Sequence, residues 1–204
     1  MMRTKYFLLA LVLFTGRNAF AQGRISWDGI FTPGLQDFRS PQTRISPDIK
    51  ANSLSAVVRI EFSFLMSNGQ FMFTKNFNDK VDCTFDPSVS FLVAQDSATA
   101  SDFVQFTCFS FDLAELYARK MRQRLYEEKR AFSRSDFYQP VYDELSHEYD
   151  VRRSNALQET EMGRKRELLA QLHQAVKTEI GQLPDFCKTC KPAKKKPSRM
   201  DDLN

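Results

Sequence analysis

A stretch from residue 101 to residue 130 carries two neighbouring apolar stripes at helical spacing, and it constrains the fold more than any other feature. The first stripe recurs at intervals of three and four and comprises Thr107, Phe111, Ala114, Ala118, Met121 and Leu125. The second stripe lies beside it and comprises Phe103, Phe106, Ser110, Leu113 and Tyr117. Two adjoining stripes predict a helix that is deeply buried over its first four turns, with Asp102 as its N-terminal cap.

The segments on either side of this helix predict a mixed architecture. Residues 58–66 alternate between apolar and polar side chains, which is the period of a half-buried strand. Asn68-Gly69 then predicts a tight turn into a return strand, followed by a loop over 78–93 that ends in a short strand. Beyond the helix, residues 142–180 predict further helix with a break near Ser154-Asn155 or Gly163. The expected class is α+β, with an N-terminal antiparallel hairpin packed on the long helix and further helix after it.

The first 21 residues have the pattern of a cleavable signal peptide. Arg3 and Lys5 precede an apolar run over 7–16, and Ala19-Phe20-Ala21 offers the small residues that a signal peptidase requires. The run is shorter than the ~20 apolar residues of a membrane span, and nothing later in the chain predicts a transmembrane segment. We therefore expect an exported protein, periplasmic or extracellular, with one domain over 22–182 and a basic, disordered tail over 183–204 that includes a C-x-x-C motif.

Four cysteines in an exported chain are disulfide candidates, and they allow three pairings. Cys83 and Cys108 lie in the body, whereas Cys187 and Cys190 form the C-K-T-C motif near the end. A local bridge between Cys187 and Cys190, or a tether to the body, is preferred to a redox or metal-handling role. A redox motif would need a preceding strand and a following helix, and two thiols are too few for a closed zinc site.

The charge distribution gives no support to a nucleic-acid-binding body. Three basic residues in 1–21 and an excess of four positive charges in 188–204 leave residues 22–187 with a net charge of about −3. The lysine-rich run 191–199 could contact an anionic surface such as acidic lipid headgroups, although such runs are usually only solvated.

The region 103–122 resembles the core motif of a family of predicted secreted, zinc-dependent proteases of Gram-negative bacteria, which is otherwise known only as a domain of unknown function. That motif runs roughly L-x-x-H-E-x-x-H-F-D-x-A-E-x-Y-A-R-K-x-R. The matching positions are Phe111, Asp112, Ala114, Glu115, Tyr117, Ala118, Arg119, Lys120 and Arg122. Weaker matches include Leu35, Asp37 and Phe38 before the helix and residues 159–163 after it, so the resemblance covers roughly 24–180. It implies a zincin-like helix at the centre of the fold.

The resemblance also shows what this chain lacks. In a zinc peptidase, two histidines four residues apart on one helix hold the metal and a glutamate activates the bound water. In the family's register the two histidines fall on Phe106 and Ser110, the glutamate falls on Thr107, and a downstream histidine falls on Met162. A phenyl ring has no lone pair, a neutral hydroxyl is a poor zinc ligand, and a thioether prefers softer metals. We expect no catalytic residues here and no cofactor.

Three polar residues of the motif remain candidates for a binding role. Asp112, Glu115 and Arg119 could line a retained groove, or they could be structural, since Glu115 and Arg119 have the spacing of a helix ion pair. The two histidines of the chain, His147 and His173, are expected to be solvated rather than catalytic.

These observations lead to one preferred function and two alternatives. We expect an exported, catalytically inactive metalloprotease-like protein that binds an unidentified protein or has a structural role in the cell envelope. One alternative is an active secreted hydrolase or peptidase with an unrecognised site, for which zinc would be expected. The other is a redox or metal-handling protein that uses Cys187 and Cys190.

Overall fold

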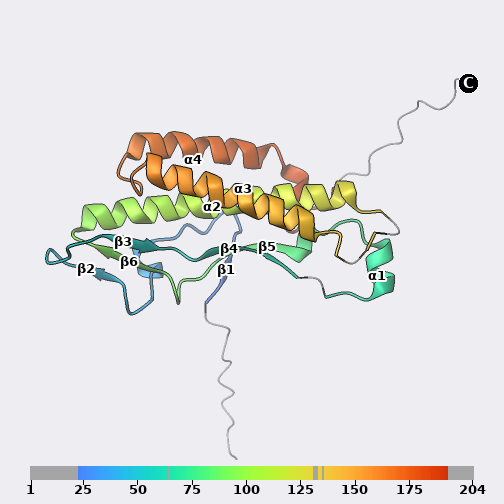
Figure 1. Cartoon of the computed structure of the whole chain (residues 1–204), viewed down its shortest axis with the longest axis horizontal. Helices are drawn as coiled ribbons and strands as arrows, with labels where there is room; N and C mark the ends of the chain where they lie inside the picture. Colours follow the sequence, from blue (N-terminus) through green and yellow to red (C-terminus); the bar gives the residue numbers. More distant parts are fainter. Residues whose placement is uncertain (1–22, 64, 131–132, 135, 193–204) are drawn as a thin grey trace, which may run out of the picture.

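The computed structural model describes residues 23–63, 65–130, 133–134 and 136–192, and it confirms the expected α+β class. The predicted signal peptide and the last twelve residues lie outside the described part of the chain. Three long helices form a layer over two small sheets (Figure 1). The helices are α1 (Asn68–Phe73), α2 (Ser97–Glu128), α3 (Gln139–Glu159) and α4 (Arg166–Gly181). The strands are β1 (Ile25–Ser26), β2 (Arg44–Ile45), β3 (Ser53–Ser55), β4 (Val58–Phe62), β5 (Val81–Phe85) and β6 (Phe91–Ala94).

Helix α2 is the central element of the core, as its two apolar stripes predict. It packs against α3 and α4 on one side and against β4, β5 and β6 on the other. It begins five residues before the predicted cap, because the side chain of Asp96 accepts a hydrogen bond from the backbone N–H of Thr99 at 2.7 Å. Asp102 was the wrong choice of cap, since it lies inside the helix and its carboxylate pairs with Arg166 at 2.5 Å.

The two sheets have the strand orders β1-β5-β4 and β2-β6-β3. Strand β4 is confirmed, but its antiparallel partner is β5, in a segment that the sequence predicted as loop. The predicted hairpin at Asn68-Gly69 is wrong because these residues form the first turn of α1. Ser67 Oγ accepts from the N–H of Gln70 at 3.2 Å, and Gln70 Oε1 accepts from the N–H of Ser67 at 3.0 Å. This reciprocal capping box favours a helix over a two-residue turn.

The break between α3 and α4 falls at Gly163, one of the two predicted places. Gly163 has a φ of +95°, and a Cβ atom there would lie 2.4 Å from the backbone oxygen of Asp102. Glycine is therefore required both by the backbone conformation and by the close approach to α2. The turn docks the start of α4 against the beginning of α2.

Residues 183–190, which we call the C-terminal strap, pack against the body rather than forming part of a disordered tail. The strap contains a short 3-10 helix, η3 (Pro184–Phe186), and the expected local bridge between Cys187 and Cys190. The other two cysteines, Cys83 and Cys108, are unbridged and buried.

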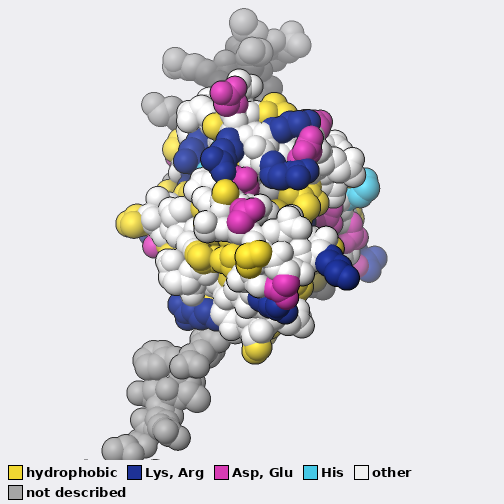
Figure 2. All heavy atoms as spheres, turned by 90° about the vertical axis from the view of Figure 1, so that its left-hand side faces the viewer, with side chains coloured by type: hydrophobic (Ala, Val, Ile, Leu, Met, Phe, Trp, Pro, Cys, Tyr) yellow, Lys and Arg dark blue, Asp and Glu magenta, His cyan; other side chains and the backbone are white. Residues whose placement is uncertain are grey.

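Two further features concern the surface charge and the described helices. On the face of the molecule shown in Figure 2, basic and acidic side chains are interspersed and do not form a field of one sign. None of the described helices combines the length and the apolar character that crossing a lipid bilayer requires.

Candidate functional site

The α2 positions that the expected register aligns with the zinc-peptidase motif lie in the interior of the protein. Phe106, Thr107 and Ser110 each have 0% of their surface exposed to solvent. Thr107 Oγ1 donates to the backbone oxygen of Phe103 at 2.9 Å, and Ser110 Oγ donates to that of Phe106 at 2.9 Å. Both hydroxyls are thus satisfied within the helix itself.

The side chain of Phe106, which the expected register aligns with the first metal ligand, packs against neighbouring apolar groups. Its ring centroid lies 5.7 Å from that of Phe109, and its Cβ lies 3.3 Å from where a Cβ of Gly163 would be. Met162 precedes that glycine and packs against the smaller apolar cluster, which includes Phe103. Phe106 and Met162 therefore contribute to packing between α2 and the α3–α4 turn, whereas the hydroxyls of Thr107 and Ser110 are bonded within α2.

The residues present do not fit a zinc ion at this place. A phenyl ring, two hydroxyls bonded to carbonyls and one thioether supply none of the imidazole, thiolate or carboxylate donors that zinc prefers. Within the described part of the chain, no group of three or more His, Cys, Asp or Glu side chains is arranged to hold a metal ion.

Asp112 joins three parts of the fold. Its Oδ1 accepts a hydrogen bond from Trp27 Nε1, and its Oδ2 lies at the same 2.7 Å distance from His173 Nε2 on α4. Burial of Asp112 opposes its ionisation, but the hydrogen bonds from His173 and Trp27 outweigh that effect and lower the pKa of its carboxyl group. The expectation that His173 is merely solvated is wrong, since its side chain is 18% exposed and bonded to Asp112.

Glu115 lies at the centre of a buried cluster with two arginines of the same helix. Its Oε1 accepts from Arg119 Nε and from Arg122 Nη1, both at 2.9 Å. The exposed fractions of the three side chains are only 2%, 10% and 1%, respectively. Each guanidinium also donates to backbone oxygens of other segments. These are the oxygens of Val81, Ile180, Leu183 and Phe186.

These contacts favour the structural interpretation of Glu115 and Arg119. Their polar atoms hold β5, the end of α4 and the C-terminal strap against α2, and none of the three segments could be released without leaving a buried donor unpaired. Arg119 also lies over the ring of Trp27, with its Cζ 5.4 Å from the ring centroid. Trp27 therefore connects Asp112 to Arg119, and the three candidate binding residues form one continuous structural network.

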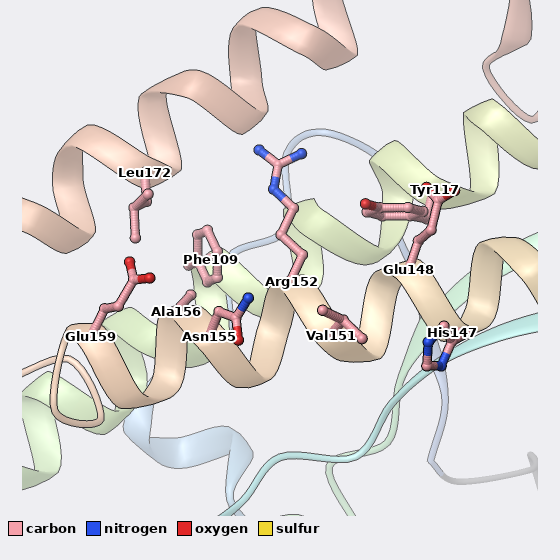
Figure 3. Close-up of a pocket in the computed structure, with 10 residues that line it drawn as sticks. All are labelled: Phe109, Tyr117, His147, Glu148, Val151, Arg152, Asn155, Ala156, Glu159 and Leu172. Atoms are coloured by element: carbon pink, nitrogen blue, oxygen red, sulfur yellow. The ribbon is translucent and has the colours of Figure 1, made fainter.

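Two grooves of the described surface flank α3, and sequence reasoning identified neither. The first has a volume of about 500 Å³ and lies among α2, α3 and α4 (Figure 3). Phe109 and Leu172 give it an apolar wall, and Arg152 projects into it while forming two bonds to Glu179 at 2.6 and 3.0 Å. The second has a volume of about 600 Å³ and lies between β4 and α3. Both depend on how separate elements pack, which no local sequence pattern reveals.

The first groove offers polar contacts without an evident nucleophile. Its ten lining residues include His147, Glu148 and Glu159 but no serine, threonine or cysteine. His147 stands at one end of the labelled set in Figure 3, away from Glu159. The arrangement suits binding of a small or extended molecule better than nucleophilic catalysis.

Comparison of the chain with protein families, with curated proteins and with solved structures gives no match.

Proposed function

We propose that this chain is an exported, metalloprotease-like protein that has lost metalloprotease catalysis and acts by binding or as a structural component of the cell envelope. The proposal rests on the resemblance of the α2 sequence to the protease motif and on the residues that replace its ligands. One observation carries it. Phe106, Thr107 and Ser110 are fully buried, and the hydroxyls of Thr107 and Ser110 are bonded to carbonyls of the same helix. Neither metal coordination nor proton transfer to a water is available from these three side chains.

Metal analysis of the mature protein is the most direct test of the proposal. After incubation with zinc and gel filtration, we expect far less than one equivalent of zinc per chain and no change in melting temperature on addition of a chelator. Stoichiometric zinc, or peptide cleavage that a chelator abolishes, would instead support an active hydrolase with an unrecognised site.

Restoring the motif tests whether the former site has become core. The triple variant Phe106→His/Thr107→Glu/Ser110→His places three polar side chains in the interior, and we expect it to lose at least about 3 kcal/mol of stability without gaining zinc. The matched control is Gln105→His, which puts the same imidazole on the exposed face of α2 and is expected to leave stability within about 0.5 kcal/mol of the parent. A triple variant as stable as Gln105→His would refute the proposal.

A further inference from the structure

The C-terminal strap is attached to the body in two parts, and the first part does not involve its disulfide. The backbone oxygens of Leu183 and Phe186 accept hydrogen bonds from Arg119 and Arg122, at 3.1 and 2.9 Å. Both acceptors precede Cys187 in the chain. Since both arginines are buried, these bonds are strong constraints on residues 183–186.

The second part of the strap is held through the bridged turn. The backbone oxygen of Cys190 accepts from Asn78 Nδ2 at 2.9 Å and from Asn76 Nδ2 at 3.2 Å. Within the turn, the N–H of Cys190 donates to the backbone oxygen of Cys187 at 3.0 Å. The bridge between Cys187 and Cys190 closes the same turn covalently and so keeps the Cys190 carbonyl directed at both amides.

Asn78 is the most buried of these partners and has little else to hold it. Only 1% of its surface is exposed, and Nδ2 donates to Asp185 as well as to Cys190, both at 2.9 Å. Its Oδ1 is buried and has no hydrogen-bond partner among the described residues. Loss of the Cys190 contact would leave the amide with a single bond through its side chain.

Lys188 adds two contacts from inside the bridged turn. Its Nζ donates to Asp82 Oδ2 at 2.6 Å and to Ser26 Oγ at 3.4 Å. The lysine side chain is 38% exposed, so this ion pair lies at the surface and is weak alone. The position of Lys188 therefore depends on the disulfide that closes the turn.

We propose that the bridge between Cys187 and Cys190 is a thiol-sensitive latch. Reduction by a dithiol releases the distal part of the strap, residues 187–190, while residues 183–186 stay docked on α2. The partner implied is a small-molecule or protein dithiol of the compartment in which the protein resides. This role does not depend on whether the protein binds zinc, because the bridge lies outside the protease-like motif.

The exchange is balanced in atoms and electrons. A thiolate of the dithiol attacks the sulfur of Cys187, forms a mixed disulfide and expels the sulfur of Cys190 as a thiolate, which takes up a proton. The second thiol of the reductant then attacks the mixed disulfide and frees Cys187. The dithiol is oxidised to a disulfide, and the two cysteines together gain two electrons and two protons.

Hydrogen exchange measured by NMR on the full chain, with and without dithiothreitol, tests the latch. We expect the side-chain amide of Asn78 and the backbone amide of Cys190 to exchange on the order of 10- to 30-fold faster after reduction, because the disulfide no longer restricts the turn. The backbone amide of Leu183, which donates to Ile180 at 3.1 Å, should exchange at an unchanged rate.

The double variant Cys187→Ser/Cys190→Ser is the matched control. It should show the faster exchange without dithiothreitol and no response to it, because Cys83 and Cys108 are unbridged. Three results would overturn the proposal: a bridge that dithiothreitol does not reduce, a reduced bridge with unchanged exchange at Asn78 and Cys190, or equal acceleration at Leu183.

Discussion

Replacing Glu115 by alanine should be one of the most destabilising single substitutions in this protein. Glu115 is the shared anion between Arg119 and Arg122, and it accepts three hydrogen bonds from them at 2.9, 2.9 and 3.4 Å. After its removal both guanidinium groups would keep their bonds to backbone oxygens but would lose their only described counterion. Two positive charges would then lie in the interior of the fold.

The burial of these charges sets the magnitude. Breaking a buried ion pair by removing one partner costs about 3–5 kcal/mol, because the remaining charge is uncompensated. That is a large share of the ~5–15 kcal/mol that separates the folded and unfolded states of an ordinary domain. Glu115→Gln keeps the volume and one acceptor, so we expect a smaller loss of stability than for alanine.

The chain supplies a matched control on the same helix. Glu128 pairs with Arg124 at 2.6 Å across the same four-residue spacing, but the two side chains are 43% and 36% exposed. Exposed pairs of this kind contribute only about 0.3–0.5 kcal/mol. Glu128→Ala should therefore have almost no effect, although the chemical change is identical.

Urea unfolding followed by fluorescence measures both variants, and Trp27 is the only tryptophan of the chain. Its ring lies under Arg119 and its N–H is bonded to Asp112, so its emission should report on the packing of this network. If Glu115→Ala lies within about 1 kcal/mol of Glu128→Ala at an unchanged denaturant slope, the two arginines are not buried as described and the reasoning fails.

Three further outcomes follow from the contacts. Gly163→Ala should lower stability by more than about 2 kcal/mol, because its Cβ would stand 2.4 Å from the backbone oxygen of Asp102 at a positive φ. Gly69→Ala should leave stability unchanged, because a Cβ there would have no neighbour within 4 Å. Thermal melts that give the two variants the same melting temperature would contradict this prediction. Asp112 has a lowered pKa, so its contribution to stability is present above the ordinary value of about 3.9 and is lost as the pH falls through the lower folded value. Asp112→Asn should accordingly lose less stability than the parent between pH 5 and about 2, and parallel acid-unfolding curves would exclude the effect. Burial raises the pKa of Cys83 well above its usual range and that of Cys108 to about 11. A thiol reagent at about pH 8 should therefore label neither cysteine until the chain unfolds. Rapid labelling of the native protein would show instead that these thiols are exposed.

The elements with a long apolar period were predictable, and those defined by a short pattern were not. Thirty residues of two-stripe periodicity located the end of α2 to within two residues, but the predicted start was six residues too late. Asn68-Gly69, by contrast, is a two-residue signal, and the capping pair of Ser67 and Gln70 overrode it locally. Strand β5 was missed although its five residues, Val-Asp-Cys-Thr-Phe, alternate between apolar and polar side chains, because so short a run directly after Asn76 to Lys80 was interpreted as part of a loop.

The candidate site was predictable only as far as single-residue chemistry allows. That Phe106 and Ser110 offer no good donor for zinc follows directly from their residue types. The contact between Asp112 and His173 joins residues 61 positions apart, and the pattern of neither helix indicates it. The same is true of Arg122, which a helical wheel places among apolar residues without showing that Glu115 neutralises it.

The bonds from Arg119 and Arg122 to the carbonyls near the end of α4 and in the strap have a consequence for biogenesis. Because a chain is synthesised from its N-terminus, α2 exists before Ile180, Leu183 and Phe186 are available to accept hydrogen bonds from its guanidinium groups. The helix layer can therefore reach its final state only after nearly the whole chain has emerged. Truncation before residue 180 removes all three acceptors and should leave a protein that is prone to aggregation, whereas a fusion partner attached beyond residue 192 should be tolerated.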